Sequence, residues 1–250
     1  MRLNKFIALA TGLSRREADQ IIASGRIKFR ENNTTIIAKL GAQVGIDSQV
    51  WLDNNRLELP NKTTLVMLNK PRGYVSSRNA QTRFAKTLYE LLPPEFQKLK
   101  TVGRLDKDSS GLILLTDDGD LNFQMTHPKF AKNKTYLVRL DKSLAPLHQQ
   151  MINDFGIELP DGRSKLLLEK IDNETEISRN EFEALKSDAK IDFSAREIWR
   201  VRMSEGRNRQ IRRTFSALGY DVIRLHRTEF GKYRLGELAP GETIELPVDK

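Results

Sequence analysis

The stretch VGRLDKDSSGLILL, residues 102–115, places a polar loop bounded by glycines directly before an apolar run. The run 112–115 has the length and composition of a buried strand. Scaffolds often place catalytic groups in loops at the edge of a buried sheet. Asp106 in this loop can therefore act as a nucleophile, a general base or a metal ligand.

Asp106 also begins a pattern that partly matches a calcium-binding loop, with Asp108, Ser110 and Gly111 following and Asp117 at the twelfth position. That position normally holds a bidentate glutamate, and the apolar residues that follow Gly111 stand where further ligands are needed. Calcium is therefore disfavoured. A solvated aspartate in a turn remains the plain alternative for any single residue of this kind.

Strand and helix signals alternate irregularly on both sides of this loop, which predicts an α+β fold with a mixed sheet. The predicted strands are 65–69, 112–116, 134–140, 166–171, 198–204, 222–225 and 243–246. The predicted helices are 84–92, 118–126, 143–155, 180–187 and 208–218. The polar stretch 172–193 is interpreted as a surface excursion.

The first 59 residues form a separate small unit in this interpretation, followed by the polar linker 60–64 and a second domain, 65–250. Apolar residues at helical spacing predict a helix that Gly12 ends. Ser14 and Glu17 form a capping box at the start of a second helix. The predicted strands of this unit are 26–29, 35–37 and 49–52.

The composition indicates a soluble protein with a polyanionic partner. Lys and Arg number 42 against 33 Asp and Glu, a net charge of +9. Segment 194–234 contains ten Arg and one Lys against four acidic residues, and Arg is suited to phosphate and base contacts. The absence of cysteine excludes disulfides, thiolate metal sites and a cysteine nucleophile, and fits a reducing compartment. No apolar run is long enough for a membrane span.

Two further motifs carry candidate chemistry. In KTYLV, residues 134–138, Tyr136 alternates along a predicted strand, where it can pack in the core or stack on a base. In EGRNRQIRRTF, residues 205–215, four arginines crowd the start of an amphipathic helix. Arg212 lies beside apolar neighbours and would need a carboxylate partner if half-buried. The alternative is that all four arginines are solvated.

Together these motifs resemble the RsuA/RluB/RluF-type family of ribosomal RNA pseudouridine synthases, over nearly the whole chain. The segments that carry the resemblance are RLNKF at 2–6, SRREA at 14–18, GRI at 25–27, NKPRG at 69–73, GRLD at 103–106, KTY at 134–136 and NRQIRR at 208–213. The chain departs from the family at 172–193, which is longer than usual, and at 30–33, where the usual Asn-Gly-type hairpin is missing.

The resemblance implies a small S4-like RNA-binding domain at 1–59. It also implies a pseudouridine synthase domain with a mixed, mostly antiparallel sheet and a catalytic cleft. The implied reaction detaches uracil from C1′ of a uridine, turns it and rejoins it through C5, with no metal and no cofactor. The expected partner is ribosomal RNA or a pre-ribosomal particle. The expected protein is a cytoplasmic monomer that does not bind membranes.

The resemblance also implies roles for individual residues. Asp106 is the essential carboxylate, Tyr136 stacks on the uracil, and Arg212 pairs with Asp106 and keeps it ionised. The substrate-binding residues are Arg104, Leu225, Lys70 and Arg209. The RNA-binding residues are Arg2, Lys5, Arg15, Arg16, Arg26, Arg207 and Arg213. Arg15 and Arg16 also stand out physically, because basic residues in a first helical turn oppose the helix dipole.

Two other functions stay open at this point. One is a non-catalytic RNA-binding factor for ribosome assembly, which an intact set of Asp106, Tyr136 and Arg212 argues against. The other is a metal-dependent nuclease using the carboxylates of Asp106, Asp108, Asp117 and Asp118, which a chelator would inactivate. Among RNA substrates, the 23S RNA of the large subunit is favoured, and the 16S RNA of the small subunit is possible.

Overall fold

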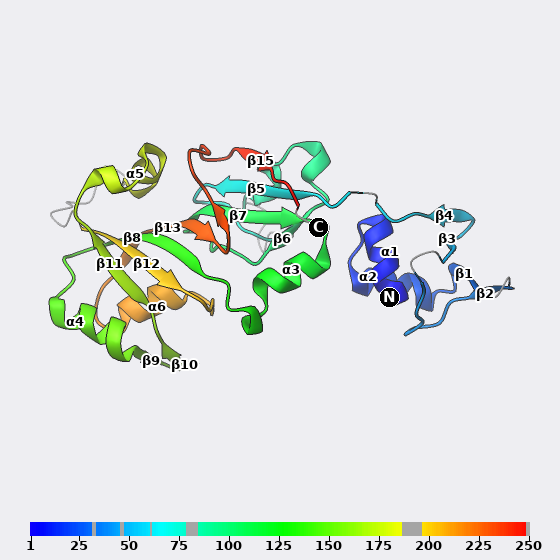
Figure 1. Cartoon of the computed structure of the whole chain (residues 1–250), viewed down its shortest axis with the longest axis horizontal. Helices are drawn as coiled ribbons and strands as arrows, with labels where there is room; N and C mark the ends of the chain where they lie inside the picture. The colour runs from blue at the N-terminus through cyan, green and yellow to red at the C-terminus, as the bar shows by residue number, and fades with distance from the viewer. Residues whose placement is uncertain (32–33, 46–47, 61, 79–84, 187–196, 249–250) are drawn as a thin grey trace. The chain divides into compact units, whose positions relative to one another are not determined.

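The computed structural model describes residues 1–31, 34–45, 48–60, 62–78, 85–186 and 197–248 (Figure 1). The chain divides into two compact units, Met1–Thr64 with the last residues of the chain, and Leu65–Pro247.

The first unit packs two helices, α1 (Leu3–Thr11) and α2 (Arg15–Ala23), with a four-stranded antiparallel sheet. The strand order is β2-β1-β3-β4, with bounds Thr34–Ile37, Ile27–Glu31, Val50–Leu52 and Asn55–Leu57. The capping box is present as predicted: the Ser14 hydroxyl accepts from Glu17 N, and the Glu17 carboxylate accepts from Ser14 N. Strand β4 was not predicted.

The second unit is built on a nine-stranded sheet whose main path runs β11-β12-β8-β13-β7-β5-β15. These strands span Leu167–Ile171, Ile198–Met203, Lys134–Leu140, Val222–Phe230, Ser110–Thr116, Leu65–Lys70 and Thr243–Glu245. Two short strands extend it: β6 (Lys100–Val102) pairs with β7, and β14 (Tyr233–Arg234) pairs with β13. Among the described strands of this sheet, β13 and β7 pair in parallel and the other pairs are antiparallel, so the expected α+β fold with a mixed, mostly antiparallel sheet is confirmed.

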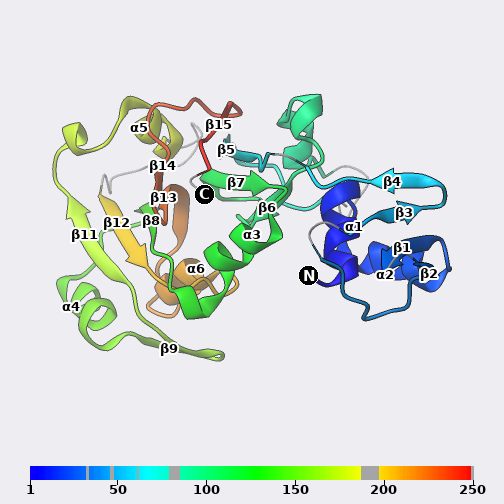
Figure 2. The ribbon, with the colours of Figure 1, turned by 45° about the vertical axis from the view of Figure 1, so that its right-hand side comes forward.

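Strand β13 lies between β7 and β8 and joins two halves of the sheet (Figures 1 and 2). The parallel pairing brings Gly111 opposite Arg227. Gly111 has φ 103°, and a Cβ at this position would lie 2.2 Å from the Arg227 carbonyl oxygen. Only glycine permits this close approach of the two strands.

Four α-helices accompany the sheet: α3 (Gly119–Thr126), α4 (Pro146–Gln150), α5 (Arg179–Leu185) and α6 (Gln210–Ser216). Helix α6 packs against β13 and against β9 (Ile157–Leu159), which forms a separate hairpin with β10 (Gly162–Ser164) (Figure 2). Short 3-10 turns occur at Leu88–Leu91, Pro94–Phe96, Pro128–Phe130 and Glu174–Glu176.

Several predicted elements differ from the structure. Of the helix expected at 84–92, the structure contains the 3-10 turn Leu88–Leu91, and residue 84 lies outside the described residues. The helix expected at 143–155 starts at Pro146 and becomes a π-helical turn after Gln150. Strand β13 extends to Phe230, and β6, β9, β10 and β14 were missed.

The interpretation of 172–193 as a surface excursion is wrong for the described part of that stretch. Helix α5 packs against β8 and β13. Ile177 and Leu185 are buried in a small core with Leu137 and Ile198, because the polar residues of α5 face outward around a short apolar stripe. Residues 187–193 lie outside the described residues. No helix in the described ranges is long and apolar enough to cross a membrane.

Candidate active site

A cavity of about 550 Å³ opens in the second unit beside the loop that precedes β7. Its walls come from the 103–109 loop, the end of α3, strands β8 and β13, and the 203–211 segment that leads into α6. The residues that line it include Arg104, Asp106, Lys134, Tyr136, Arg209, Leu225, Arg227 and Phe230. Residues more than 100 positions apart in the chain thus meet at one site.

The loop that carries Asp106 is held by the fold on both sides. The Ser76 hydroxyl donates to Leu105 O at 2.7 Å and accepts from Leu105 N at 3.1 Å. Ser109 N donates to Asp106 O at 3.1 Å, which closes a turn around the aspartate. The Asp106 side chain keeps 31% of its surface exposed, so its carboxylate is accessible from the cavity.

Arg209 is the cation next to Asp106. Its Nη1 lies 3.8 Å from Asp106 Oδ2 and 3.7 Å from Asp108 Oδ2. Arg209 precedes α6 with φ 47° and ψ 31°, a left-handed conformation that is uncommon outside glycine. This backbone geometry brings its side chain to the two carboxylates.

Arg212 does not make the contact expected from the sequence. Its guanidinium donates to Val222 O at 2.6 Å and to the backbone oxygen of Asp108 at 3.1 Å, and it lies outside the cavity lining. Burial and the neighbouring charge of Arg209 lower the pKa of Arg212, and the attraction of Asp108 and Asp106 opposes that effect. Arg212 therefore anchors the 106–108 turn to β13, and Arg209 takes the expected place beside Asp106.

Tyr136 and Leu225 form part of the cavity wall from adjacent strands, β8 and β13. Tyr136 is 8% exposed and Leu225 is 7% exposed, so both are core residues with one side toward the cavity. Arg227 is paired with Tyr136 in the ladder, and its guanidinium carbon lies 6.0 Å from the Tyr136 ring centroid. The wall combines an aromatic ring, an aliphatic side chain and a cation.

Two lysines near the cavity are held by backbone oxygens. Lys70 is fully buried behind the lining, and its Nζ donates to Ser109 O at 2.8 Å and Pro71 O at 3.0 Å. Lys134 Nζ donates to Lys132 O at 3.1 Å and Glu205 O at 3.3 Å. Burial lowers the pKa of Lys70 to about 8 despite the attraction of Asp106 and Asp108. Burial, with Arg227 nearby, also lowers the pKa of Lys134 to about 8.

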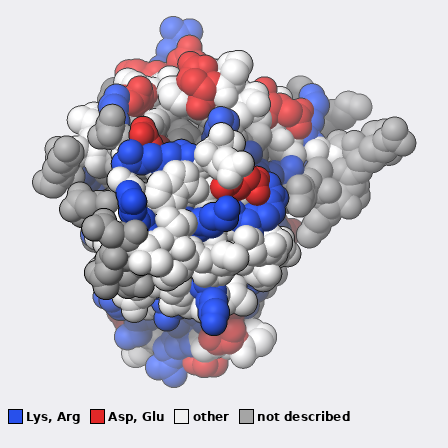
Figure 3. Space-filling view, turned by 90° about the vertical axis from the view of Figure 1, so that its right-hand side faces the viewer, with Lys and Arg blue, Asp and Glu red and all other residues white. Residues whose placement is uncertain are grey.

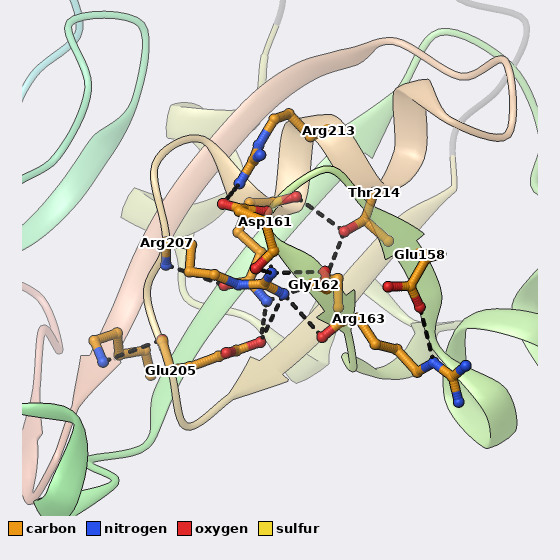
Figure 4. A network of polar contacts seen from close by, with 11 residues as sticks. Glu158, Asp161, Gly162, Arg163, Glu205, Arg207, Arg213 and Thr214 are labelled. Carbon is orange, nitrogen blue, oxygen red and sulfur yellow. Dashed lines mark hydrogen bonds and ion pairs between the residues drawn. The ribbon is translucent and has the colours of Figure 1, made fainter.

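A polar network fixes the segment that enters α6 (Figure 4). Arg207 Nη1 lies 3.0 Å from Asp161 Oδ1 and donates to Gly162 O at 2.7 Å, and Arg213 Nη2 lies 2.7 Å from Asp161 Oδ2. Both arginines were expected to bind RNA, but their guanidinium groups are engaged with the β9–β10 hairpin. Arg213 lowers the pKa of Asp161, which keeps this carboxylate charged as their partner.

The predicted RNA-binding residues of the first unit differ in their surroundings. Arg2, Arg15 and Arg16 are exposed at the starts of the two helices, and Lys5 is half-buried on α1. Arg26 forms an ion pair with Asp53 at 2.7 Å, so its charge is already balanced. In the space-filling view of Figure 3, blue Lys and Arg atoms and red Asp and Glu atoms are interspersed.

The carboxylates that a nuclease would need do not converge. Among the described residues, no group of three His, Asp or Glu side chains can hold a metal ion. Asp118 instead caps α3 by accepting from Asp120 N and Leu121 N. The calcium pattern fails as well, because Ser110–Thr116 is a fully buried strand.

The sequence interpretation missed Lys134, Arg227 and Phe230 as cavity residues. Lys134 begins the KTYLV motif that contains Tyr136, and Arg227 lies two residues beyond the predicted strand 222–225. Their alternation with Tyr136 and Leu225 was visible, but only strand pairing shows which side of each strand faces the cavity.

Comparisons with known proteins identify the family to which this chain belongs. The model of a family described as RNA pseudouridylate synthase matches residues 64–217. Ribosomal large subunit pseudouridine synthase B of Bacillus subtilis is 32% identical over 98% of this chain and 91% of its own length. Ribosomal small subunit pseudouridine synthase A of Yersinia pestis is 34% identical over 100% of this chain and 96% of its own length.

A crystal structure of a pseudouridylate synthase shares the fold, with a TM-score of 0.62 and 28% identity over 99% of this chain and 96% of that one. The family match covers the loop of Asp106, Tyr136 and the start of α6, whereas β13, which also lines the cavity, lies beyond the matched residues. The chain therefore belongs to the RNA pseudouridylate synthase family, a family of isomerases.

Proposed function

We propose that this chain converts uridine to pseudouridine in ribosomal RNA, with Asp106 as the essential carboxylate. The observation that carries this proposal is the position of Asp106. Its carboxylate is accessible at the cavity edge and lies beside Arg209, while Tyr136 and Leu225 line the wall. A flipped uridine placed against that wall brings its ribose toward the carboxylate, and enclosure keeps the detached base in place.

The proposed roles follow the geometry. Asp106 attacks C1′ or removes a ribose proton, and Tyr136 stacks on the uracil ring. Leu225 packs against the same ring, and exposed Arg104 holds the flipped nucleotide at the cavity rim. Arg209 neutralises Asp106 and Asp108, while buried Lys70 braces the turn through Ser109 O. No metal or cofactor takes part in this scheme.

The proposal extends to the whole chain. Residues 1–59 act as an S4-like RNA-binding domain, residues 60–64 as a linker, and residues 65–250 as the catalytic domain of a cytoplasmic monomer. The 23S RNA of the large subunit is the favoured substrate, although the relatives include enzymes named for either subunit.

The decisive experiment compares Asp106→Asn with Asp108→Asn. Both carboxylates lie within 4 Å of Arg209, but only Asp106 lines the cavity. We expect D106N to lose activity by about 1000-fold or more, because an amide can neither attack C1′ nor remove the proton. D108N should keep most of its activity. Pseudouridine formation in ribosomal RNA is measured in the presence of a chelator.

Equal activity of D106N and the wild type would refute the role of Asp106. Loss of wild-type activity in chelator alone would favour the nuclease-like metal chemistry. RNA binding without any pseudouridine formation by the wild type would identify a non-catalytic RNA-binding factor.

A further inference from the structure

Arg227 is a buried cation without a carboxylate partner. It is 2% exposed on β13 and lines the cavity. Its Nε donates to Leu112 O at 2.7 Å, but its Nη2 is buried and has no hydrogen-bond partner. Within the described parts of the chain it forms no ion pair. A buried charge left in this state is costly, so a compensating acceptor is expected from outside the chain.

The surroundings of Arg227 specify the kind of acceptor. Its guanidinium carbon lies 6.0 Å from the Tyr136 ring centroid and 5.0 Å from that of Phe230. The charge of Arg227 contributes to lowering the pKa of Lys134, and the Lys134 ammonium donates hydrogen bonds to two backbone carbonyl oxygens. The site thus offers flat apolar walls and positive charge, which suit a planar, electron-rich ring.

The pairing of strands β7 and β13 fixes the position of Arg227. The parallel pairing of β7 and β13 needs Gly111, where a Cβ would lie 2.2 Å from the Arg227 carbonyl oxygen. Arg224 on the same strand is a useful contrast. It is 6% exposed, its guanidinium donates to Lys186 O and Ile223 O, and it does not line the cavity.

We propose that Arg227 binds the uracil of the target nucleotide through a carbonyl oxygen and stabilises the negative charge on the base while it is detached. This inference rests on the proposed function. When the C1′–N1 bond breaks, its electron pair leaves with the uracil, whether Asp106 bonds to C1′ or removes a ribose proton. The pair spreads onto the carbonyl oxygens until C5 bonds to C1′. In that step the Asp106–C1′ bond breaks, or the proton that Asp106 removed returns to the ribose; the C5 proton then departs and N1 is protonated.

A charged donor fixed in a site shielded from water is well suited to charge that develops only during the reaction. A phosphate of the RNA is the less suitable occupant, because its charge would have to leave water for a site beside the rings of Tyr136 and Phe230. Exposed Arg104 at the rim is the better phosphate contact.

The test compares the wild type with Arg227→Gln, Arg227→Lys and the matched control Arg224→Gln, all in the full chain. The substrate is ribosomal RNA transcribed with tritium at C5 of uridine, and tritium release reports the reaction. Single-turnover rates at saturating enzyme are measured beside RNA affinity by filter binding, and thermal melts check folding.

We expect R227Q to slow the single-turnover rate by about 100- to 1000-fold, the usual effect of losing one such donor, with RNA affinity nearly unchanged. R227K keeps the charge but loses the planar fork, so it should be about 3- to 30-fold slower. R224Q should react at nearly the wild-type rate.

A single-turnover rate equal to that of the wild type, in R227Q or in R227K, would overturn the inference. Weaker RNA affinity at an unchanged rate would also overturn it, because that result indicates a phosphate contact. If R227Q does not fold, the rate of R227K alone tests the inference. If Arg227 only filled space, lysine would replace it without slowing the reaction. Absence of tritium release by the wild type would instead refute the proposed function, and this inference with it.

Discussion

At the scale of single residues, Tyr136 allows its ring and its hydroxyl to be tested separately. The ring lies in the cavity wall with 8% of the residue exposed. We expect Tyr136→Phe to bind RNA normally and to turn over slowly, if the hydroxyl assists loss of the C5 proton. Tyr136→Leu also removes the stacking surface, so its RNA affinity should fall too. Full activity of Y136F would leave Tyr136 with a packing role only.

His226 gives the protein a predictable sensitivity to acid. Its Nδ1 lies 2.9 Å from Ser110 Oγ, its Nε2 is buried without a partner, and burial lowers its pKa to about 4. Between about pH 6.5 and pH 4 the unfolded chain therefore binds a proton that the folded chain does not. The free energy of unfolding should fall by about 3 kcal/mol as the pH falls through this window.

Urea unfolding of His226→Asn at several pH values checks this expectation. The variant lacks the titrating ring, so its stability should depend less on pH across the same window. Exposed His127 serves as the control, because His127→Asn should leave the wild-type pH dependence in place. Identical pH profiles for H226N and the wild type would contradict the assignment.

At the scale of elements, the β9–β10 hairpin supports the start of α6 through one carboxylate. Asp161 binds both Arg207 and Arg213, which flank Arg209 in the sequence. We expect Asp161→Asn to lower the free energy of unfolding, because it weakens two partly exposed ion pairs at once. The enzyme should also slow, because the segment that carries Arg209 loses a support.

Glu158→Gln on the same hairpin is the matched control. Glu158 pairs only with Arg163, and both side chains are more than half exposed. Such a pair contributes little, so E158Q should match the wild type in urea unfolding and in activity. If D161N and E158Q behaved alike, the support assigned to Asp161 would be wrong.

The elements that sequence reasoning found are those with strong local signals. The capping box of α2 and the apolar runs of β5 and β7 are set by neighbouring residues. The short strands β6 and β9 were missed because three residues are too few to show an alternating pattern. Leu185 of α5 is buried because α5 packs against β8 and β13, which lie far from it in the sequence. Local patterns do not contain that information.

Some residues of the candidate site could likewise be predicted from the sequence, and others could not. The family resemblance named Asp106 and Tyr136 as site residues, and both line the cavity. The local pattern around Tyr136 alone left core packing and base stacking open. The choice between Arg209 and Arg212 as the neighbour of Asp106 depends on the left-handed backbone at Arg209, which nothing in an arginine-rich sequence indicates. The buried Arg227 required knowledge of the sheet order.

At the scale of the whole molecule, the first unit should contribute affinity for RNA. Arg15 and Arg16 are exposed at the start of α2, whereas Arg26 is neutralised by Asp53. In the double variant Arg15→Gln/Arg16→Gln we expect weaker RNA binding, with a salt dependence shallower by about 1.4 to 1.8 logarithmic units per tenfold change in salt. Arg26→Gln should change the slope less. RNA binding measured at several salt concentrations gives these slopes. An unchanged slope in the double variant would contradict an RNA contact at Arg15 and Arg16.

The position of β13 also has a consequence for how the enzyme is made. The halves β11-β12-β8 and β7-β5-β15 meet only through this strand, which comes late in the chain, at Val222–Phe230. A growing polypeptide can pair β5 with β7 and β8 with β12 as it leaves the ribosome, but β13 joins the two halves only after residue 230 has emerged, and β15 adds to β5 later still. Catalytic competence is therefore gained in one late event, and an incomplete chain cannot modify RNA before its synthesis is nearly finished.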